Sequence, residues 1–204
     1  MMKLSNRRAL PVRTISNPNF KDIITSKQKW QLEQWINRKC SEIIFNSEKD
    51  CWAYEISVLN EKIIGKEHLV FLIEDDQNQK FGYYLNSKVI EEYATSENGQ
   101  EKRIEVDNNS FQFSLESVGR FTDAIKCEII DTKKGGYNLY TNWENNLLIS
   151  FGDIMVYKQG LENNSYCIHQ DNNVFDYHGK EKVLCDKVGS QTFNIKKFVV
   201  IQMK

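Results

Sequence analysis

The chain has 204 residues and a formal net charge of -1, which fits one domain or one domain with an arm and gives no overall field that would attract nucleic acid or anionic lipid. Hydrophobic residues make up 40% and charged residues 27%, proportions typical of a soluble globular protein. No apolar run approaches the ~20 residues needed to cross a bilayer, so we expect no membrane span.

Residues 1–25 form a distinct polar segment. They carry both prolines of the chain and a cluster of three basic side chains, Arg7, Arg8 and Arg13. A short segment of this composition has too little apolar surface to build a core of its own. We predict a flexible basic N-terminal arm over residues 1–25 and one folded domain over residues 26–204.

Two helices are predicted in the first part of this domain. Ser26 is a suitable N-cap, and the apolar residues that follow it recur at helical spacing. A short buried strand over residues 42–46 comes next, before a second helix over 51–64 that Gly65 would end. The apolar faces carry Leu32, Trp35, Ile36 and Cys40 in the first helix, and Trp52, Ile56, Leu59 and Ile63 in the second.

Short strands dominate from residue 68 onward. Residues 68–74 and 80–85 are rich in apolar and β-branched side chains and flank a turn, which predicts a β-hairpin. Residues 87–109 are mostly polar and predict a long loop. Further strands are predicted over residues 110–115, 125–130, 147–157, 166–169 and 195–203. Early helices followed by many short strands predict an α+β fold, with two antiparallel β-sheets packed as a sandwich with flanking helices.

Several phenylalanine motifs follow one another along these elements. In chain order they are Phe81-Gly82, Phe111-Gln112-Phe113-Ser114-Leu115, Phe151-Gly152 and Phe193-Asn194-Ile195. Their order and spacing over residues 30–203 resemble the TLDc domain family. The resemblance implies a sandwich of two antiparallel sheets and a family without established catalytic residues. It also implies a link to protection against oxidative damage and, as in several members, binding to the vacuolar proton ATPase.

The motif residues also have a simple structural interpretation. Gly82 and Gly152 fall within predicted strands, where glycine allows a bulge or a close backbone approach. Two positions depart from the family pattern: Asp153 replaces its second glycine, and Val199 replaces the acid of its last strand. The polar role of that acid does not carry over to a valine. The aromatic side chains expected to fill the core are Phe81, Phe111, Phe113 and Phe151.

The cysteines favour an intracellular protein. Their number is odd, they are scattered, and none forms a Cys-x-x-Cys pair, which argues against a disulfide framework. The first ten residues lack the apolar centre of a secretory signal. We therefore expect a cytoplasmic or nuclear location with reduced thiols. The five cysteines are Cys40, Cys51, Cys127, Cys167 and Cys185.

One group of residues is a candidate zinc site. Cys167 and His169 lie on the same side of a predicted strand, and His178 and Cys185 follow. Four such ligands can hold zinc, but structural zinc sites use closely spaced cysteine pairs. We therefore predict no metal and no cofactor, and we interpret both cysteines as buried, apolar residues.

Other candidate chemistry is incomplete. The sequence does not place His68 or another histidine beside a cysteine, as a cysteine nucleophile requires. Cys40 and Cys51 flank the first strand, and an exposed thiol there could act as a redox sensor. The acidic run Glu74-Asp75-Asp76 lacks the further ligands of a calcium loop, so we interpret it as a solvated turn.

The leading hypothesis is a non-catalytic regulatory domain that binds a protein partner. It rests on the TLDc resemblance, which names the vacuolar proton ATPase as the partner, and on the incomplete catalytic groupings. The first alternative is a DNA-binding transcriptional regulator that uses the arm and the basic stretch Lys196-Lys197-Phe198. The second alternative is a cysteine-dependent enzyme or redox sensor.

Overall fold

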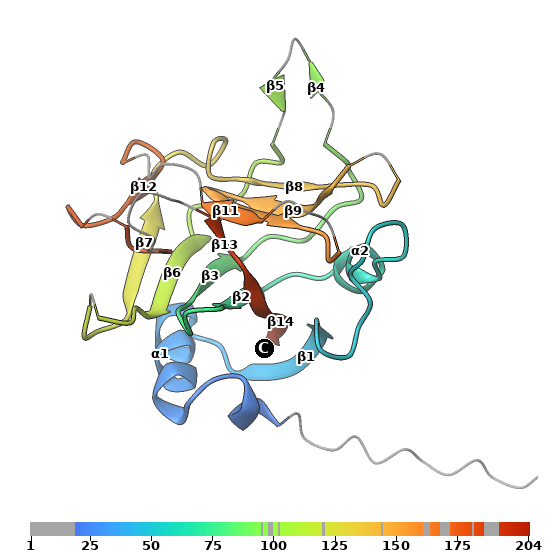
Figure 1. Cartoon of the computed structure of the whole chain (residues 1–204). Helices are drawn as coiled ribbons and strands as arrows, with labels where there is room; N and C mark the ends of the chain where they lie inside the picture. The colour runs from blue at the N-terminus through green and yellow to red at the C-terminus, as the bar shows by residue number, and fades with distance from the viewer. Residues whose placement is uncertain are drawn as a thin grey trace, which may run out of the picture.

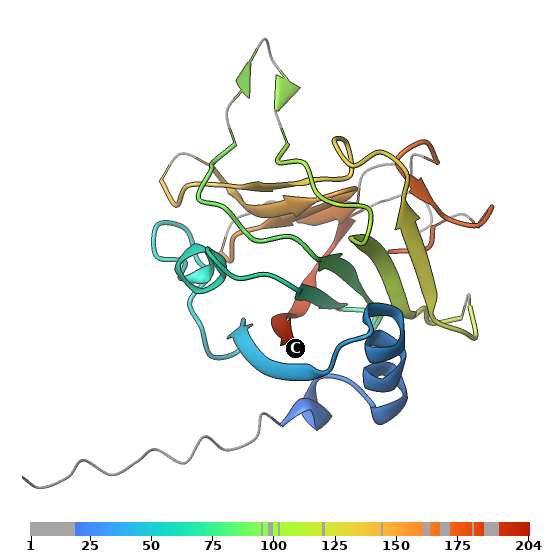
Figure 2. The ribbon, with the colours of Figure 1, turned by 180° about the vertical axis from the view of Figure 1, so that it is seen from behind.

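The computed structural model describes residues 19–94, 96–97, 100–101, 103–119, 121–143, 145–160, 164–167, 172–180, 182–185 and 192–204. These residues form two antiparallel β-sheets that pack against each other, with one helix on the outer side of the larger sheet (Figures 1 and 2). The predicted sandwich with flanking helices is confirmed. Within the described part of the chain, no helix has the length and apolar character needed to cross a membrane.

The larger sheet has seven strands, and the last strand of the chain lies inside it. The order is β1-β14-β2-β3-β6-β7-β12, so β14 pairs with β1 on one side and β2 on the other. The predicted hairpin is confirmed as β2 and β3. The strands are β1 (Cys40–Asn46), β2 (Leu69–Asp75), β3 (Lys80–Leu85), β6 (Phe111–Glu116), β7 (Ile125–Ile129), β12 (Phe175–Asp176) and β14 (Ile195–Met203).

The smaller sheet has five strands in the order β13-β11-β10-β9-β8. The single strand predicted over 147–157 is wrong, because the chain reverses at Gly152 and Asp153 and forms the hairpin β9–β10. Gly152 has a φ of 53°, a left-handed conformation that glycine adopts without a steric penalty. The strands are β8 (Tyr137–Leu139), β9 (Leu147–Phe151), β10 (Ile154–Tyr157), β11 (Ser165–Cys167) and β13 (Thr192–Phe193).

The long loop predicted over 87–109 contains a small ribbon. Its two short strands, β4 (Ser96–Glu97) and β5 (Gln100–Glu101), pair only with each other among the described strands. The ribbon stands away from both sheets at the top of Figure 1. The rest of the loop returns to the smaller sheet, where Ile104 bridges to Tyr137.

The N-cap of the first helix, α1 (Ser26–Ile36), lies one residue earlier than predicted. Thr25, and not Ser26, is the N-cap: its hydroxyl accepts the Gln28 N–H at 3.2 Å, and the Gln28 side chain accepts the Thr25 N–H at 3.0 Å. Gln28 also donates to Glu116 of β6 at 3.0 Å, which ties the start of the helix to the sheet. The segment before it is ordered too, with the short helix η1 (Phe20–Asp22) and a buried Ile23.

The second helix is much shorter than predicted. Only α2 (Leu59–Ile63) is helical, and residues 51–58 form a loop in which Glu55 has a φ of 68°. The helical spacing that included Ile56 is misleading, because this side chain is 63% exposed and does not contribute to the core. The prediction of a helix over 51–64 is therefore wrong in its first half.

Strand alternation divides the core into two layers. Phe71 and Ile73 of β2 point into the core between the sheets, whereas Val70 and Leu72 belong to the core under α1. The four predicted core phenylalanines are all buried. Phe81 and Phe151 lie between the sheets, and Phe111 and Phe113 lie on the helix side.

Gly82 lies within β3, as predicted, and the reason is close backbone packing. A Cβ atom at this position would lie 1.9 Å from the carbonyl oxygen of Phe71 on β2 and 3.0 Å from the Phe113 ring. Backbone atoms of a paired strand cannot move away without breaking the ladder. The glycine of the Phe-Gly motif is therefore explained by packing alone.

Candidate functional site

Three of the five cysteines are buried, and burial keeps them in the thiol form. Removal from water raises the pKa of Cys40 to about 11 and also raises the pKa values of Cys127 and Cys167. The hypothesis of an exposed Cys40 is wrong. Cys51 and Cys185 are half-buried. Both Cys167 and Cys185 were predicted to be buried, but only Cys167 is fully buried.

The two described histidines, His68 and His178, have polar partners. His68 Nδ1 lies 3.0 Å from the side-chain oxygen of Asn86, and His178 pairs with Glu128 at 3.3 Å on the surface. His169 of the candidate zinc set lies outside the described residues. Within the described ranges, no group of three or more histidine, cysteine, aspartate or glutamate side chains is placed to hold a metal ion.

The acidic turn is solvated at Asp76, as predicted, but Asp75 is buried. Its carboxylate accepts the backbone N–H groups of Gln77 at 2.9 Å and Gln79 at 2.8 Å, and the Gln79 side chain at 3.0 Å. Burial raises the pKa of Asp75 above its ordinary value, although these hydrogen bonds act in the opposite direction. The carboxylate stabilises the hairpin turn from inside.

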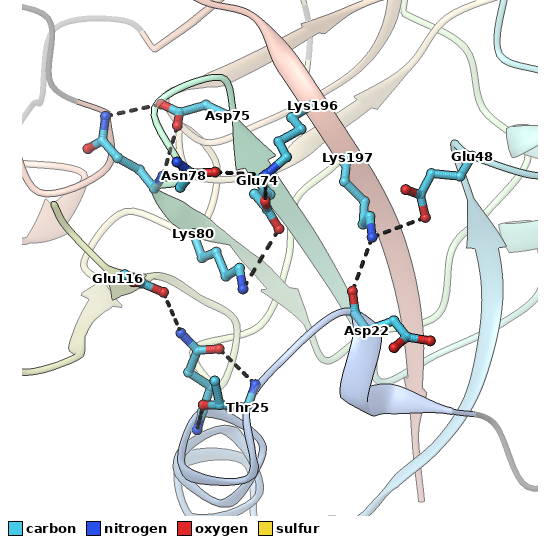
Figure 3. Close-up of polar contacts among 12 residues, drawn as sticks. Asp22, Thr25, Glu48, Glu74, Asp75, Asn78, Lys80, Glu116, Lys196 and Lys197 are labelled. Atoms are coloured by element: carbon cyan, nitrogen blue, oxygen red, sulfur yellow. Dashed lines mark hydrogen bonds and ion pairs between the residues drawn. The ribbon is translucent and has the colours of Figure 1, made fainter.

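The two lysines of the predicted basic stretch both have acidic partners. Lys196 Nζ lies 2.5 Å from Glu74 Oε1, and Lys197 Nζ lies 3.0 Å from Glu48 Oε2 (Figure 3). Lys197 also donates to the carbonyl oxygen of Asp22 at 3.1 Å. Each ammonium group would have to leave a carboxylate to contact a phosphate, so β14 gives the DNA-binding alternative little support.

Asp153 is buried beside Tyr177. The tyrosine hydroxyl lies 2.6 Å from Asp153 Oδ2 and 2.7 Å from Gln112 Oε1. Burial and the Asp153 charge raise the pKa of Tyr177, so its hydroxyl keeps its proton and donates. A Cβ atom at Gly152 would lie 2.3 Å from Gln112 Nε2. Tyr177, Asp153 and Gln112 therefore form a buried polar connection between the two sheets.

Two loops expose large apolar side chains near one end of the smaller sheet. Residues 51–58 form the first loop, and the second, which begins at 140, joins β8 to β9. Ile56 in the first loop is 63% exposed, and Trp143 in the second is 69% exposed. Both views place α2, which follows the first loop, beside the β8–β9 connection (Figures 1 and 2).

Hydrogen bonds hold these two loops together. The Tyr54 hydroxyl donates to the Trp143 carbonyl oxygen at 2.6 Å, and the Glu55 N–H donates to the Asn142 carbonyl oxygen at 3.3 Å. The Asn142 side chain donates in return to the Ser57 carbonyl oxygen at 2.9 Å. We call the group formed by the exposed Ile56 and Trp143 and the half-buried Tyr54 the Trp143 surface.

Lys158 supports the second loop from inside the protein. Its side chain is buried, and its Nζ donates to the carbonyl oxygens of Thr141 at 2.7 Å, Asn142 at 3.2 Å and also Asn145. Burial lowers the pKa of Lys158, yet three carbonyl acceptors require the three N–H donors of the ammonium form. The same Nζ lies 5.1 Å from the centre of the Tyr54 ring.

The arrangement is suited to binding. An exposed tryptophan on a backbone that is already fixed can bury a large area without a large ordering cost. Tyrosine and tryptophan are the residues most enriched at the centres of protein interfaces. The Trp143 surface is therefore the best candidate site on the described part of the chain.

No model of a known protein family matches this chain, and no curated protein matches it either.

The sequence alone does not predict the Trp143 surface. Helical spacing places Ile56 on the apolar face of a helix, and no sequence pattern assigns Trp143 to a helix or strand. A signal was present, because polar residues flank Trp143 on both sides (Thr141-Asn142 before it and Asn145-Asn146 after it), which is a loop composition. Nothing in the sequence indicates that Lys158 supports this loop.

Proposed function

We propose that this chain is a non-catalytic TLDc-type regulatory domain that binds a protein partner through the Trp143 surface. The observation that carries the proposal is the exposure of Trp143 and Ile56 on two loops that are fixed by hydrogen bonds. The order of the phenylalanine motifs supports the family, and the two-sheet sandwich is the architecture that the family resemblance implies. A cytoplasmic or nuclear location belongs to the same proposal.

The resemblance identifies the partner to test, the vacuolar proton ATPase. A protein partner that covers the Trp143 surface would remove the indole ring of Trp143 and the side chain of Ile56 from water. Truncation of such a central residue typically weakens a complex by about 2 kcal/mol or more, which is roughly a thirtyfold rise in Kd.

The experiment titrates the labelled full chain with the purified cytosol-facing sector of the vacuolar proton ATPase. We expect saturable binding that Trp143→Ala weakens at least tenfold and Ile56→Ser weakens less. Trp30→Ala is the matched control, because Trp30 is 57% exposed but lies on α1, at the opposite side of the larger sheet.

Two results would overturn separate parts of the proposal. Equal affinity of the wild type and Trp143→Ala would remove the Trp143 surface as the binding site. Absence of wild-type binding at micromolar concentrations would remove this ATPase as the partner. The resemblance further assigns a role in protection against oxidative damage, and survival of peroxide-treated cells that express wild type or Trp143→Ala tests that role.

A further inference from the structure

One tyrosine hydroxyl faces two oxygen acceptors inside the protein. Tyr177 Oη lies 2.6 Å from Asp153 Oδ2 and 2.7 Å from Gln112 Oε1, and all three residues are buried. A hydroxyl has one proton to donate, so it can satisfy only one of these oxygens at a time. The other two oxygens are then held at hydrogen-bond distance with no proton between them, unless the group binds a second proton.

The Gln112 amide is not the source of this second proton. Its Nε2 is directed toward the carbonyl oxygen of Phe151 at 3.5 Å, and this orientation places Oε1 toward Tyr177. With the amide turned around, Oε1 would face the Phe151 carbonyl oxygen, and two acceptors would oppose each other in the core. The second proton therefore has to come from solvent and reside on Asp153.

We propose that Tyr177, Asp153 and Gln112 form a binding site for one proton, which the folded protein holds on the Asp153 carboxyl group. Asp153 Oδ2–H then donates to Tyr177 Oη, and the Tyr177 hydroxyl donates to Gln112 Oε1. These hydrogen bonds run in one direction, from the β9–β10 turn of the smaller sheet to β6 of the larger sheet. Every short contact in the group has its proton. This proposal does not depend on the Trp143 surface.

The surroundings of the group favour a neutral carboxyl group. Burial away from water disfavours a charged carboxylate at Asp153. Burial and Asp153 raise the pKa of Tyr177, so the tyrosine keeps its own proton and does not lend it to Asp153. Cys127 of β7 and Cys167 of β11 also lie near Tyr177, and burial raises the pKa of both, so they are neutral thiols.

Charged groups on neighbouring elements act on the site in opposite directions. Arg103 Nη1 donates to the carbonyl oxygen of Gly152, next to Asp153, and its charge opposes protonation of the carboxylate. The buried Asp75 of β2 acts on Cys167, as Asp153 does, and its charge favours protonation. The charged groups near Cys127 are exposed to solvent, which weakens their effect: Glu128, Asp176 and Lys180.

Release of the proton leaves one short contact without a hydrogen. Tyr177 can then serve either Asp153 or Gln112, and the remaining acceptor is repelled, so the connection between the two sheets weakens. The folded protein takes up this proton at a higher pH than the unfolded chain. Its contribution to stability is therefore complete below the unfolded value of about 3.9 and is lost as the pH rises through the folded value.

The first test follows the side-chain carboxyl carbons of the folded full chain by carbon-13 NMR as the pH is varied. We expect the Asp153 carboxyl group to titrate about one pH unit or more above that of Asp123, an exposed aspartate in the same spectra. This measurement uses the wild type, so it does not depend on the folding of a variant. An Asp153 carboxyl group that titrates at or below Asp123 would overturn the proposal.

The second test compares urea denaturation of the wild type and Asp153→Asn over the same pH range. The amide of the variant donates to Tyr177 as the protonated acid does, but it does not titrate. We expect the unfolding constant of the wild type, relative to the variant, to rise by up to about tenfold per pH unit between the two titration points. Asp123→Asn is the matched control and should show no such rise, and a pH-independent ratio for Asp153→Asn would contradict the proposal.

The role of Gln112 is tested separately. Gln112→Met removes the acceptor that competes for the Tyr177 proton, so a charged Asp153 can receive the hydroxyl without a second proton. We expect the Asp153 carboxyl group of this variant to titrate at a lower pH than in the wild type. An unchanged titration would overturn the assignment of Gln112 to the proton site.

Discussion

Glu74 joins three neighbouring strands of the larger sheet through one carboxylate. It lies on β2 and contacts Lys196 of β14 at 2.5 Å and Lys80 of β3 at 3.7 Å (Figure 3). Burial alone would raise the pKa of Glu74, but the hydrogen bond from Lys196 and the neighbouring lysine charges lower it below the ordinary value of 4.5. The folded state therefore favours the charged carboxylate.

The variant Glu74→Gln should be less stable than the wild type at neutral pH, by about 1 kcal/mol. Since the pKa of Glu74 is lower in the folded than in the unfolded chain, its contribution is complete above the unfolded value of 4.5. It is lost as the pH falls through the folded value. Urea denaturation at neutral pH and at steps below 4.5 should show the difference shrinking. The exposed Glu42 of the same sheet provides a control, Glu42→Gln, and a difference for Glu74→Gln that does not change with pH would contradict this account.

The sequence could not predict this role for Glu74. It showed three consecutive acids, Glu74-Asp75-Asp76, at a turn, and consecutive acids at a turn are usually solvated. The outcome depends on sheet register, which places Lys80 opposite Glu74 on β3 and puts a register shift between Ile195 and Lys197 beside it on β14, where Lys196 contacts Glu74. Register between strands that are distant in the chain leaves no local trace in composition or spacing.

At the scale of single elements, predictions succeeded where the apolar residues of the sequence pattern are also the residues that the fold buries. The hairpin β2–β3 and the strand β14 were predicted because each strand contains a run of apolar side chains, and the fold covers these runs on both faces. The helix over 51–64 failed because apolar spacing included Ile56, which the protein exposes. The strand over 147–157 was divided by Gly152, whose left-handed φ turns the chain back.

The loop that carries Trp143 should depend on Lys158. In Lys158→Met, the carbonyl oxygens of Thr141 and Asn142 lose the ammonium partner, and we expect a loss of about 2–4 kcal/mol in the free energy of unfolding. Hydrogen exchange of the peptide that contains residues 141–143 should become faster, because the loop opens more often.

The control for this variant is Lys180→Met, which removes an exposed lysine whose Nζ lies 5.4 Å from the centre of the Phe121 ring. We expect it to cost less than about 1 kcal/mol and to leave the exchange of residues 141–143 unchanged. Similar effects of the two variants on that exchange would mean that Lys158 does not support the loop. The comparison separates a local support from a general effect of charge removal.

At the scale of the whole molecule, the sequence predicted the two packed sheets because strand periodicity and short turns limit the possible architectures. It did not predict that β14 lies between β1 and β2. That order depends on which hydrophobic faces fit together across the chain, as where Val200 pairs with both Phe45 and Phe71. The Trp143 surface could not be predicted from the sequence for the same reason, because it forms where two loops that are distant in the sequence come into contact.

Because β14 is internal, the fold should not survive its removal. A chain that stops before Ile195 leaves β1 without its partner strand and exposes one edge of β2. We expect this variant to lack a cooperative unfolding transition and to lose most of its far-ultraviolet circular dichroism. A chain that lacks only Lys204, which lies outside the strand, should fold and unfold cooperatively. A folded, cooperative protein without β14 would show that the sheet order is not essential.

The position of β14 also affects synthesis. A growing polypeptide displays β1 and β2 long before the ribosome has produced the strand that fits between them, so both present unsatisfied backbone groups during translation. Contacts between segments so far apart in sequence also form slowly. We therefore expect the nascent chain to be prone to aggregation until residues 195–203 leave the exit tunnel.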